Sequence, residues 1–204
     1  GDQNKFNKKP EKISKSIKPS REQIYNQAIQ FHSKGNISEA AKYYQYFINQ
    51  GFEDYGVFSN YGVILKSLGK LKEAEFCYRK AIKINPDFYK AHFNLGNVMK
   101  DLGKLKEAEF CYLKAIEINS SFADAYTNLG NVLRDLGNLH QAEIAFRKAI
   151  KINPNFAMFH SNLGGILKDL GKLKEAESSC LKAIEINPDY ARAYFSISNL
   201  KYSN

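Results

Sequence analysis

The feature that most constrains this chain is a stretch of sequence that recurs at a fixed interval. The letters NYGVILKSLGKLKEAEF begin at Asn60, and close copies begin at Asn94, Asn128 and Asn162, each 34 residues after the last. Self-similarity at such a period is typical of a solenoid, in which each structural repeat stacks on its neighbours along the chain. The period therefore predicts stacked repeats before any single residue is interpreted.

Each repeat carries the hydrophobic period of two helices. In one copy Phe58, Tyr61 and Leu65 lie at i, i+3 and i+7, which indicates one apolar face of a first helix. Gly69 is typical of the residue that ends such a helix, and a second helix is predicted from about Leu71 to Ile84. The fold class is therefore all-α, built of helix-turn-helix repeats. The predicted repeats cover 21–54, 55–88, 89–122, 123–156 and 157–190, with a further segment at 191–204.

Small residues recur inside the predicted helices. A glycine within a helix destabilises it by about 0.5–1 kcal/mol relative to alanine, so its repetition requires a packing reason. We expect the two helices of a repeat to approach closely at these positions. They are Gly62, Gly96, Gly130 and Gly164 on first helices, and Ala74, Ala108, Ala142 and Ala176 on second helices.

The order of these letters resembles the tetratricopeptide repeat over residues 21–204, most of the chain. The motif is an aromatic or histidine position, filled by Phe58, His92, Tyr126 and His160, followed by Leu-Gly, Ala, Tyr or Phe, Ala and Pro. The copies most resemble the repeats of O-linked N-acetylglucosamine transferase and of bacterial transferase fusions. This resemblance implies a right-handed α-solenoid, the TPR superhelix, whose first helices line the concave side.

Both ends depart from the motif. In 21–54 Ala28 replaces the first glycine, Phe47 a small residue and Phe52 the proline, which is typical of a capping repeat. Segment 191–204 is either a terminal capping helix or a partial repeat. Its apolar residues have no second helix to cover them, which favours self-association through this segment.

Residues 1–20 form a basic segment that we expect to be disordered. The segment holds six lysines against two acidic residues, and Gly1 in place of Met is interpreted as a cloning scar. Ser20 and Gln23 form a capping-box pattern, which predicts that the first helix begins near Arg21. The net charge of +9 is otherwise spread thinly, so the sequence disfavours nucleic acid as a partner.

Polar residues that recur on the first helices are the candidate site. One asparagine holds the same place in every repeat: Asn26, Asn60, Asn94, Asn128 and Asn162. This position lies roughly 130° from the centre of the apolar stripe, which predicts exposure. An amide both donates and accepts, so the column could hold the backbone of an extended peptide at every third residue. The transferase that the repeats resemble uses such an asparagine ladder. The alternative is a bond from each asparagine to a neighbouring helix.

Further columns would line the same groove. Asn97 and Asn131 add polar groups one turn away, and Phe93 either contacts a ligand at the groove edge or packs on a neighbouring helix. A basic column would favour acidic segments in a ligand, whereas an acidic column beside it would weaken that preference. Ordinary solvated ion pairs are the alternative reading. The basic column is Lys66, Lys100, Arg134 and Lys168, and the acidic column is Asp101, Asp135 and Asp169.

No constellation of residues indicates catalysis. The sequence has no HExxH, CxxC pair, phosphate-binding loop or GxSxG, and its histidines lack ligand spacing, so it predicts no enzyme, metal or cofactor. Cys77, Cys111 and Cys180 are expected to be buried free thiols, which favours a reducing, cytoplasmic setting. No apolar run is long enough to span a membrane.

Two functional hypotheses follow. The first is a non-enzymatic protein–protein interaction scaffold that binds an extended peptide, with acidic segments favoured, in its concave groove. The alternative is that the repeats form the substrate-recruiting arm of a larger glycosyl-, sulfo- or methyltransferase.

Overall fold

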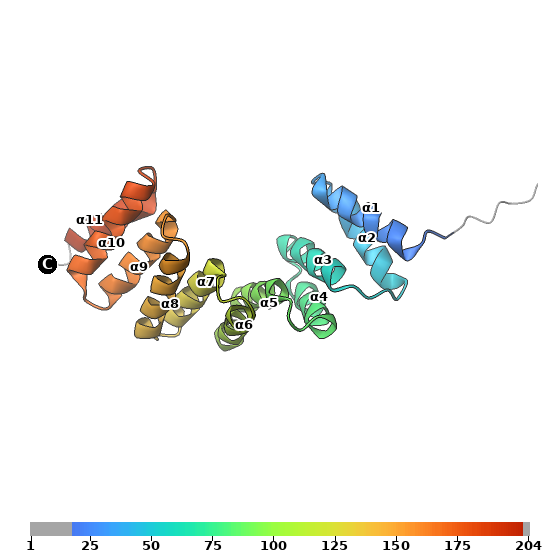
Figure 1. The fold of residues 1–204 in the computed structure, drawn as a ribbon, viewed down its shortest axis with the longest axis horizontal. Coiled ribbons are helices and arrows are strands. Elements are labelled where there is room, and N and C mark those ends of the chain that lie inside the picture. Colours follow the sequence, from blue (N-terminus) through green and yellow to red (C-terminus); the bar gives the residue numbers. More distant parts are fainter. Residues whose placement is uncertain (1–17, 202–204) are drawn as a thin grey trace, which may run out of the picture. The chain divides into compact units, whose positions relative to one another are not determined.

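The structure, a computed structural model, describes the backbone of residues 18–201 and the side chains of residues 18–198. Most of the basic segment 1–20 and the last three residues of 191–204 therefore lie outside the described residues. Within the described range every regular element is an α-helix, which confirms the all-α prediction (Figure 1). The helices are α1 (Arg21–Ser33), α2 (Ile37–Asn49), α3 (Tyr55–Ser67), α4 (Leu71–Ile84), α5 (Tyr89–Asp101), α6 (Leu105–Ile118), α7 (Ala123–Asp135), α8 (Leu139–Ile152), α9 (Ala157–Asp169), α10 (Leu173–Ile186) and α11 (Ala191–Lys201).

The chain separates into two compact units, one ending at Phe52 and the other beginning at Glu53. In the first unit α1 begins at Arg21, as predicted, because the Ser20 side chain accepts from the Gln23 backbone N–H and the Gln23 side chain accepts from the Ser20 backbone N–H. The α1 and α2 helices pack against each other around the buried side chains of Ile24, Tyr44 and Phe47.

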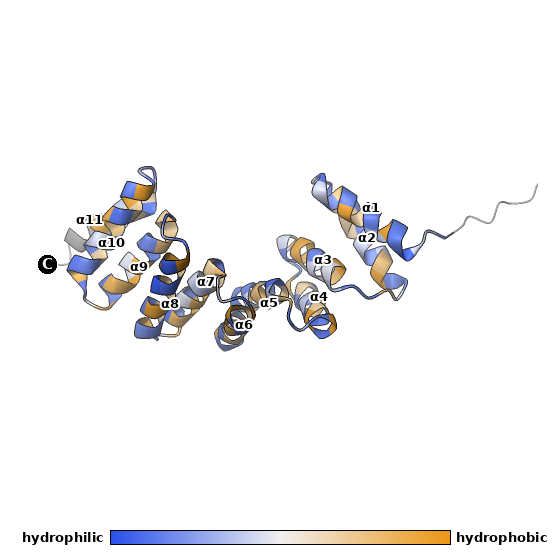
Figure 2. Cartoon of the chain, viewed as in Figure 1, coloured by the Kyte–Doolittle hydropathy of each residue, from blue (hydrophilic) through white to orange (hydrophobic). Residues whose placement is uncertain are grey.

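The second unit stacks helix pairs in chain order. Within this unit α5, α7 and α9 each pack against the second helix of their own repeat and against that of the preceding repeat, as α5 does with α6 and α4. Successive first helices also touch, α3 with α5, α5 with α7 and α9 with α11. The first helices therefore share one face of the unit, which we call the inner face. Hydrophobic and hydrophilic residues alternate around each helix in Figure 2, as burial of one stripe requires.

Glycines in the left-handed region close the turn within each repeat. Gly69 has φ of 73° and Gly103 has φ of 74°, a conformation that strains other L residues. The N–H of Gly103 donates to the carbonyl oxygen of Lys100 at 2.9 Å, which satisfies one carbonyl at the end of α5. The predicted role of Gly69 is confirmed.

The helical glycines lie under aromatic rings from the second helix of the same repeat. A Cβ on Gly96 would lie 2.6 Å from Cε1 of Tyr112, and a Cβ on Gly62 would lie 2.8 Å from Cε1 of Tyr78. Gly130 meets the Phe146 ring in the same way, at 2.8 Å. The predicted close approach is therefore confirmed, and its physical form is a ring seated on a helix backbone.

The last full repeat lacks this ring. Cys180 holds the place of Tyr78, Tyr112 and Phe146, and its Sγ would lie 2.5 Å from a Cβ on Gly164. A thiol fills much less volume than an aromatic ring. Repeat 157–190 therefore has the same close approach but a smaller group beneath its glycine.

A glutamate on α8 links two repeats on the side away from the inner face. Glu143 is buried, its carboxylate accepting from Arg147 Nε at 2.9 Å and from Lys172 Nζ at 2.8 Å. Arg147 also donates to Glu175 on α10 at 2.8 Å. Hydrogen bonds from Lys172, and then from Arg147, hold the pKa of Glu143 below its usual value, and burial opposes them only in part.

A matched pair of glycine substitutions tests the ring packing. Gly96→Ala should lower the free energy of unfolding by about 1–3 kcal/mol, because the new Cβ would overlap the Tyr112 ring. Gly165→Ala, also within a helix, should raise it by about 0.5–1 kcal/mol, because a Cβ there meets nothing within 4 Å. Urea unfolding followed by circular dichroism measures both values, and equal effects would contradict the packing described.

The pH dependence of stability tests the Glu143 bridge. Because the folded-state pKa of Glu143 is lowered, its contribution is present above the unfolded pKa and is lost as the pH falls through the folded pKa. Glu143→Gln should therefore lower Tm at pH 7, and the difference from the parent should shrink from about pH 4.5 downward. Glu177→Gln is the control, since Glu177 is exposed and makes no ion pair with a described residue. A constant difference in Tm between pH 7 and pH 3 would contradict the bridge.

Candidate functional site

The asparagine column runs along the inner face of the second unit. Asn60, Asn94, Asn128 and Asn162 come from α3, α5, α7 and α9, and all four are half-buried rather than exposed as predicted. Only Asn26, on α1 in the first unit, is exposed. Neighbouring first helices reduce the exposure of the four, which a single-helix projection does not take into account.

One member of the column is held by a hydrogen-bond network across two repeats. Asn97 Oδ1 accepts from the hydroxyl of Tyr112 at 2.8 Å and from Nδ2 of Asn128 at 2.8 Å. The network orients the Asn128 amide, whose nitrogen is engaged and whose oxygen remains an acceptor. For Asn128, the alternative of a bond to a neighbouring helix is therefore observed.

The preceding repeat cannot form this network. Val63 stands where the next repeat has Asn97, and the buried hydroxyl of Tyr78 has no hydrogen-bond partner. Burial raises the pKa of both Tyr78 and Tyr112 above the usual value. The side chains of Asn60, Asn94 and Asn162 make no hydrogen bond within the described part of the chain.

The charged columns pair with each other between repeats. Lys66 Nζ lies 3.0 Å from Asp101 Oδ2, and Arg134 Nε lies 2.9 Å from Asp169 Oδ2. Lys100, Lys168 and Asp135 make no ion pair with any residue that the structure describes. The two columns therefore do not form a continuous basic stripe.

Phe93 packs within its repeat and against the next. Its ring centroid lies 5.8 Å from that of Tyr112 and 4.8 Å from that of Phe122, the residue that precedes α7. The side chain is half-buried. Of the two readings from the sequence, these contacts favour packing.

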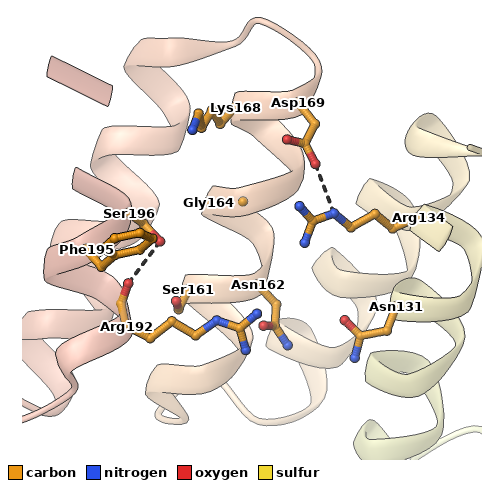
Figure 3. Close-up of a pocket in the computed structure, with 11 residues that line it drawn as sticks. Asn131, Arg134, Ser161, Asn162, Gly164, Lys168, Asp169, Arg192, Phe195 and Ser196 are labelled. Carbon is orange, nitrogen blue, oxygen red and sulfur yellow. Dashed lines mark hydrogen bonds and ion pairs between the residues drawn. The ribbon is translucent and has the colours of Figure 1, made fainter. Parts of the chain in front are cut away.

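A pocket of about 200 Å³ gathers several of the predicted residues. It lies between α7, α9 and α11, and Figure 3 shows the lining side chains converging from these three helices. From the predicted set it brings together Asn131, Arg134, Asn162, Lys168 and Asp169. It does not include Asn26, Asn60, Asn94, Asn97, Asn128, Lys66, Lys100, Asp101, Asp135 or Phe93.

Residues that depart from the repeat pattern also line this pocket. Gly165 stands where the three preceding repeats have Val63, Asn97 and Asn131, and it leaves open space. Ser161 on α9 and Arg192, Phe195 and Ser196 on α11 also line it, and the recurring Gly164 completes the wall. Reasoning from recurring letters missed all five residues other than Gly164. Gly165 and Ser196 replace residues that recur in other repeats, and that departure was a signal that could have revealed them. Ser161, Arg192 and Phe195 lie at positions that vary between repeats and gave no such signal.

The other side of the unit carries an apolar opening of about 500 Å³. Ile82, Leu95 and Cys111 line it, together with Phe110, whose side chain is 61% exposed. This opening is the main alternative binding surface.

The cysteines and histidines serve packing. Cys77, Cys111 and Cys180 are buried free thiols, as predicted, and burial raises the pKa of Cys77 to about 12. Nε2 of His92 lies 2.8 Å from the Pro86 carbonyl oxygen, and His160 repeats this contact with Pro154 at 2.7 Å. Within the described part of the chain, no three His, Cys, Asp or Glu side chains are arranged to hold a metal ion. None of its helices is both long and apolar enough to cross a membrane.

Two tyrosine substitutions distinguish the satisfied from the unsatisfied hydroxyl. Tyr112→Phe should lower the free energy of unfolding by about 1 kcal/mol, because the bond to Asn97 is lost. Tyr78→Phe should be neutral or stabilising, because it removes a buried hydroxyl that has no partner. Urea unfolding measures both, and a larger loss from Tyr78→Phe would contradict the network.

Solved structures show the same fold at low sequence identity. MamA from Desulfovibrio magneticus RS-1 is 21% identical, with a TM-score of 0.76 over 83% of this chain and 96% of that chain. YrrB, described as a TPR protein with an unusual peptide-binding site, is 22% identical, with a TM-score of 0.76 over 88% and 92%. A tetratricopeptide repeat protein from Parabacteroides merdae is 21% identical, with a TM-score of 0.78 over 89% and 72%.

Family models give the assignment directly. A tetratricopeptide repeat model matches residues 123–156 and 157–190, and a TPR repeat model matches 62–103 and 97–137. No curated protein sequence matches the chain, and no particular likeness to the repeats of O-linked N-acetylglucosamine transferase is shown. The models together cover residues 62 to 190, more than half of the chain. The chain belongs to the tetratricopeptide repeat family.

Proposed function

We propose that this chain is a non-catalytic protein–protein interaction scaffold that binds an extended polypeptide along the inner face of α3, α5, α7 and α9. The observation that supports this most is the register of four half-buried asparagines, three of which make no side-chain hydrogen bond within the described residues. Polar groups at a regular interval along one face are suited to a ligand whose own polar groups repeat at a regular interval, as those of an extended polypeptide backbone do.

The chemistry of the amide fits a polypeptide backbone. Each free amide offers a donor and an acceptor, so it can bond a backbone C=O and a backbone N–H of any sequence. Stacked helices about 10 Å apart match roughly three residues of extended chain at about 3.3 Å each. Asn128 retains its Oδ1 acceptor, because its network with Asn97 engages only the nitrogen.

The charges on this face support a limited preference for acidic ligands. Asp101 and Asp169 neutralise Lys66 and Arg134, which leaves Lys100 and Lys168 as cations without an acidic partner among the described residues. A nucleic-acid ligand would require a dense basic face to bind its phosphates, whereas two of the four basic side chains here are paired with aspartates. The buried thiols fit a reducing compartment such as the cytoplasm.

The fold offers a precedent for peptide binding. YrrB, whose fold this chain shares, is described as having a peptide-binding site. If the repeats are the substrate-recruiting arm of a larger transferase, the substrate would bind to the same inner face. The two hypotheses therefore differ in what the repeats are attached to and not in where the ligand binds. Self-association remains a separate prediction, and it is supported by the exposure of Tyr194 and Phe195 on α11.

Selection from a displayed library of random 12-residue peptides tests this function. The parent protein should enrich extended peptides, and Asn94→Ala/Asn162→Ala should weaken their binding by about tenfold or more, because two amides are lost. Asn128 is left intact, since its loss would also break the bond to Asn97. Fluorescence anisotropy with a labelled selected peptide gives the affinity.

Two controls accompany this measurement. Lys148→Ala, at an exposed position on α8, should leave the affinity unchanged. Phe110→Asp tests the apolar opening on the other side of the unit. If the asparagine variant binds as tightly as the parent while Phe110→Asp does not, the peptide occupies that opening and the groove proposal is wrong.

A further inference from the structure

We propose that the pocket between α7, α9 and α11 holds the carboxylate of one aspartate or glutamate side chain of the polypeptide that lies on the inner face. This inference rests on the proposed function and adds one selective position to a groove that otherwise binds the backbone. Asn162 connects the two roles, because it belongs to the asparagine column and also lines the pocket.

The charge of the pocket is positive and comes from three helices. Arg134, Lys168 and Arg192 line it from α7, α9 and α11, and Asp169 is the one carboxylate in the lining. Asp169 is engaged with Arg134 at 2.9 Å. Lys168 and Arg192 have no acidic partner within the described residues, so an incoming carboxylate would meet two uncompensated cations.

A buried hydroxyl is also available to a ligand. Ser161 is only 3% exposed, and its Oγ has no hydrogen-bond partner. Thr127, at the same place in the preceding repeat, donates to the Ala123 carbonyl oxygen at 3.1 Å. A buried hydroxyl without a partner is unfavourable, and an acceptor oxygen placed in the pocket would provide one.

The space fits a single side chain. About 200 Å³ corresponds to roughly six or seven water molecules at about 30 Å³ each, which is room for a carboxyl group and its methylenes. Phe195, 69% exposed, offers an apolar wall for those methylenes. The missing Cβ of Gly165 contributes to this room, and the three preceding repeats fill that place with Val63, Asn97 and Asn131.

Charge reversal is the direct test. In the same random-peptide selection, peptides enriched by the parent should share one aspartate or glutamate position. Arg192→Glu should instead enrich lysine or arginine at that position and should bind the parent-selected peptide at least tenfold more weakly. Changing the shared acidic residue of that peptide to its amide should make the parent and Arg192→Glu bind it equally. Fluorescence anisotropy measures these affinities.

A second variant closes the pocket without altering charge. Gly165→Val introduces the residue that the chain already has at Val63, and its Cβ meets nothing within 4 Å, so the variant should fold. It should lose the acidic preference while it still binds peptides through the asparagine column. Lys148→Glu, at an exposed position on α8, carries the same sign of charge change outside the groove and should leave the preference intact.

The outcomes separate the two proposals. Enriched peptides with no shared acidic position, or an acidic preference that persists in Arg192→Glu, would overturn the pocket and leave the groove standing. A selection in which the parent enriches no peptide would overturn both. A preference lost equally in Lys148→Glu would show that overall charge, and not this pocket, selects the ligand.

Discussion

The contact between a helical glycine and an aromatic ring determines how closely the two helices of a repeat can lie. The rings of Tyr78, Tyr112 and Phe146 occupy the space in which the Cβ atoms of their partner glycines would stand. Packed interiors tolerate little change in volume, so this contact fixes the distance between the helices in three successive repeats. The regular spacing of the inner-face side chains depends on that distance.

The same ring connects the core to the inner face in one repeat. Tyr112 packs on Gly96 with its ring, and its hydroxyl reaches Asn97, which in turn holds Asn128 on the next first helix. A residue that looks like core in the sequence therefore positions an amide of the candidate site. Where Val63 replaces the asparagine, the ring contact remains but the polar connection is absent.

The sequence was sufficient to predict the structural features that arise within a single repeat. The period located α4 at its observed bounds, the glycine turn at Gly69 and the register of the asparagines, because all three depend on local pattern. It did not predict the half-burial of Asn94. It offered ion pairs and bonds to neighbouring helices only as alternatives and did not name their partners, such as Asp101 for Lys66 or Asn97 for Asn128, because these depend on contacts between repeats. The pocket was not predicted for another reason. A search for recurring residues passes over residues that occur in one repeat only, such as Gly165 and Arg192 at their repeat positions.

The absence of a ring at Cys180 has a consequence for how the array holds together. In stacked repeats stability is approximately a sum over units and their interfaces, and a buried aromatic side chain contributes a large share of the apolar area. The helix pair α9 and α10 therefore opens at a lower free-energy cost than the pairs before it, and α11 depends on that pair. A ligand that bridges α7, α9 and α11 would bind only the closed arrangement and would stabilise it by mass action. Binding of a ligand between α7, α9 and α11 and closure of these helices would then be coupled in one equilibrium.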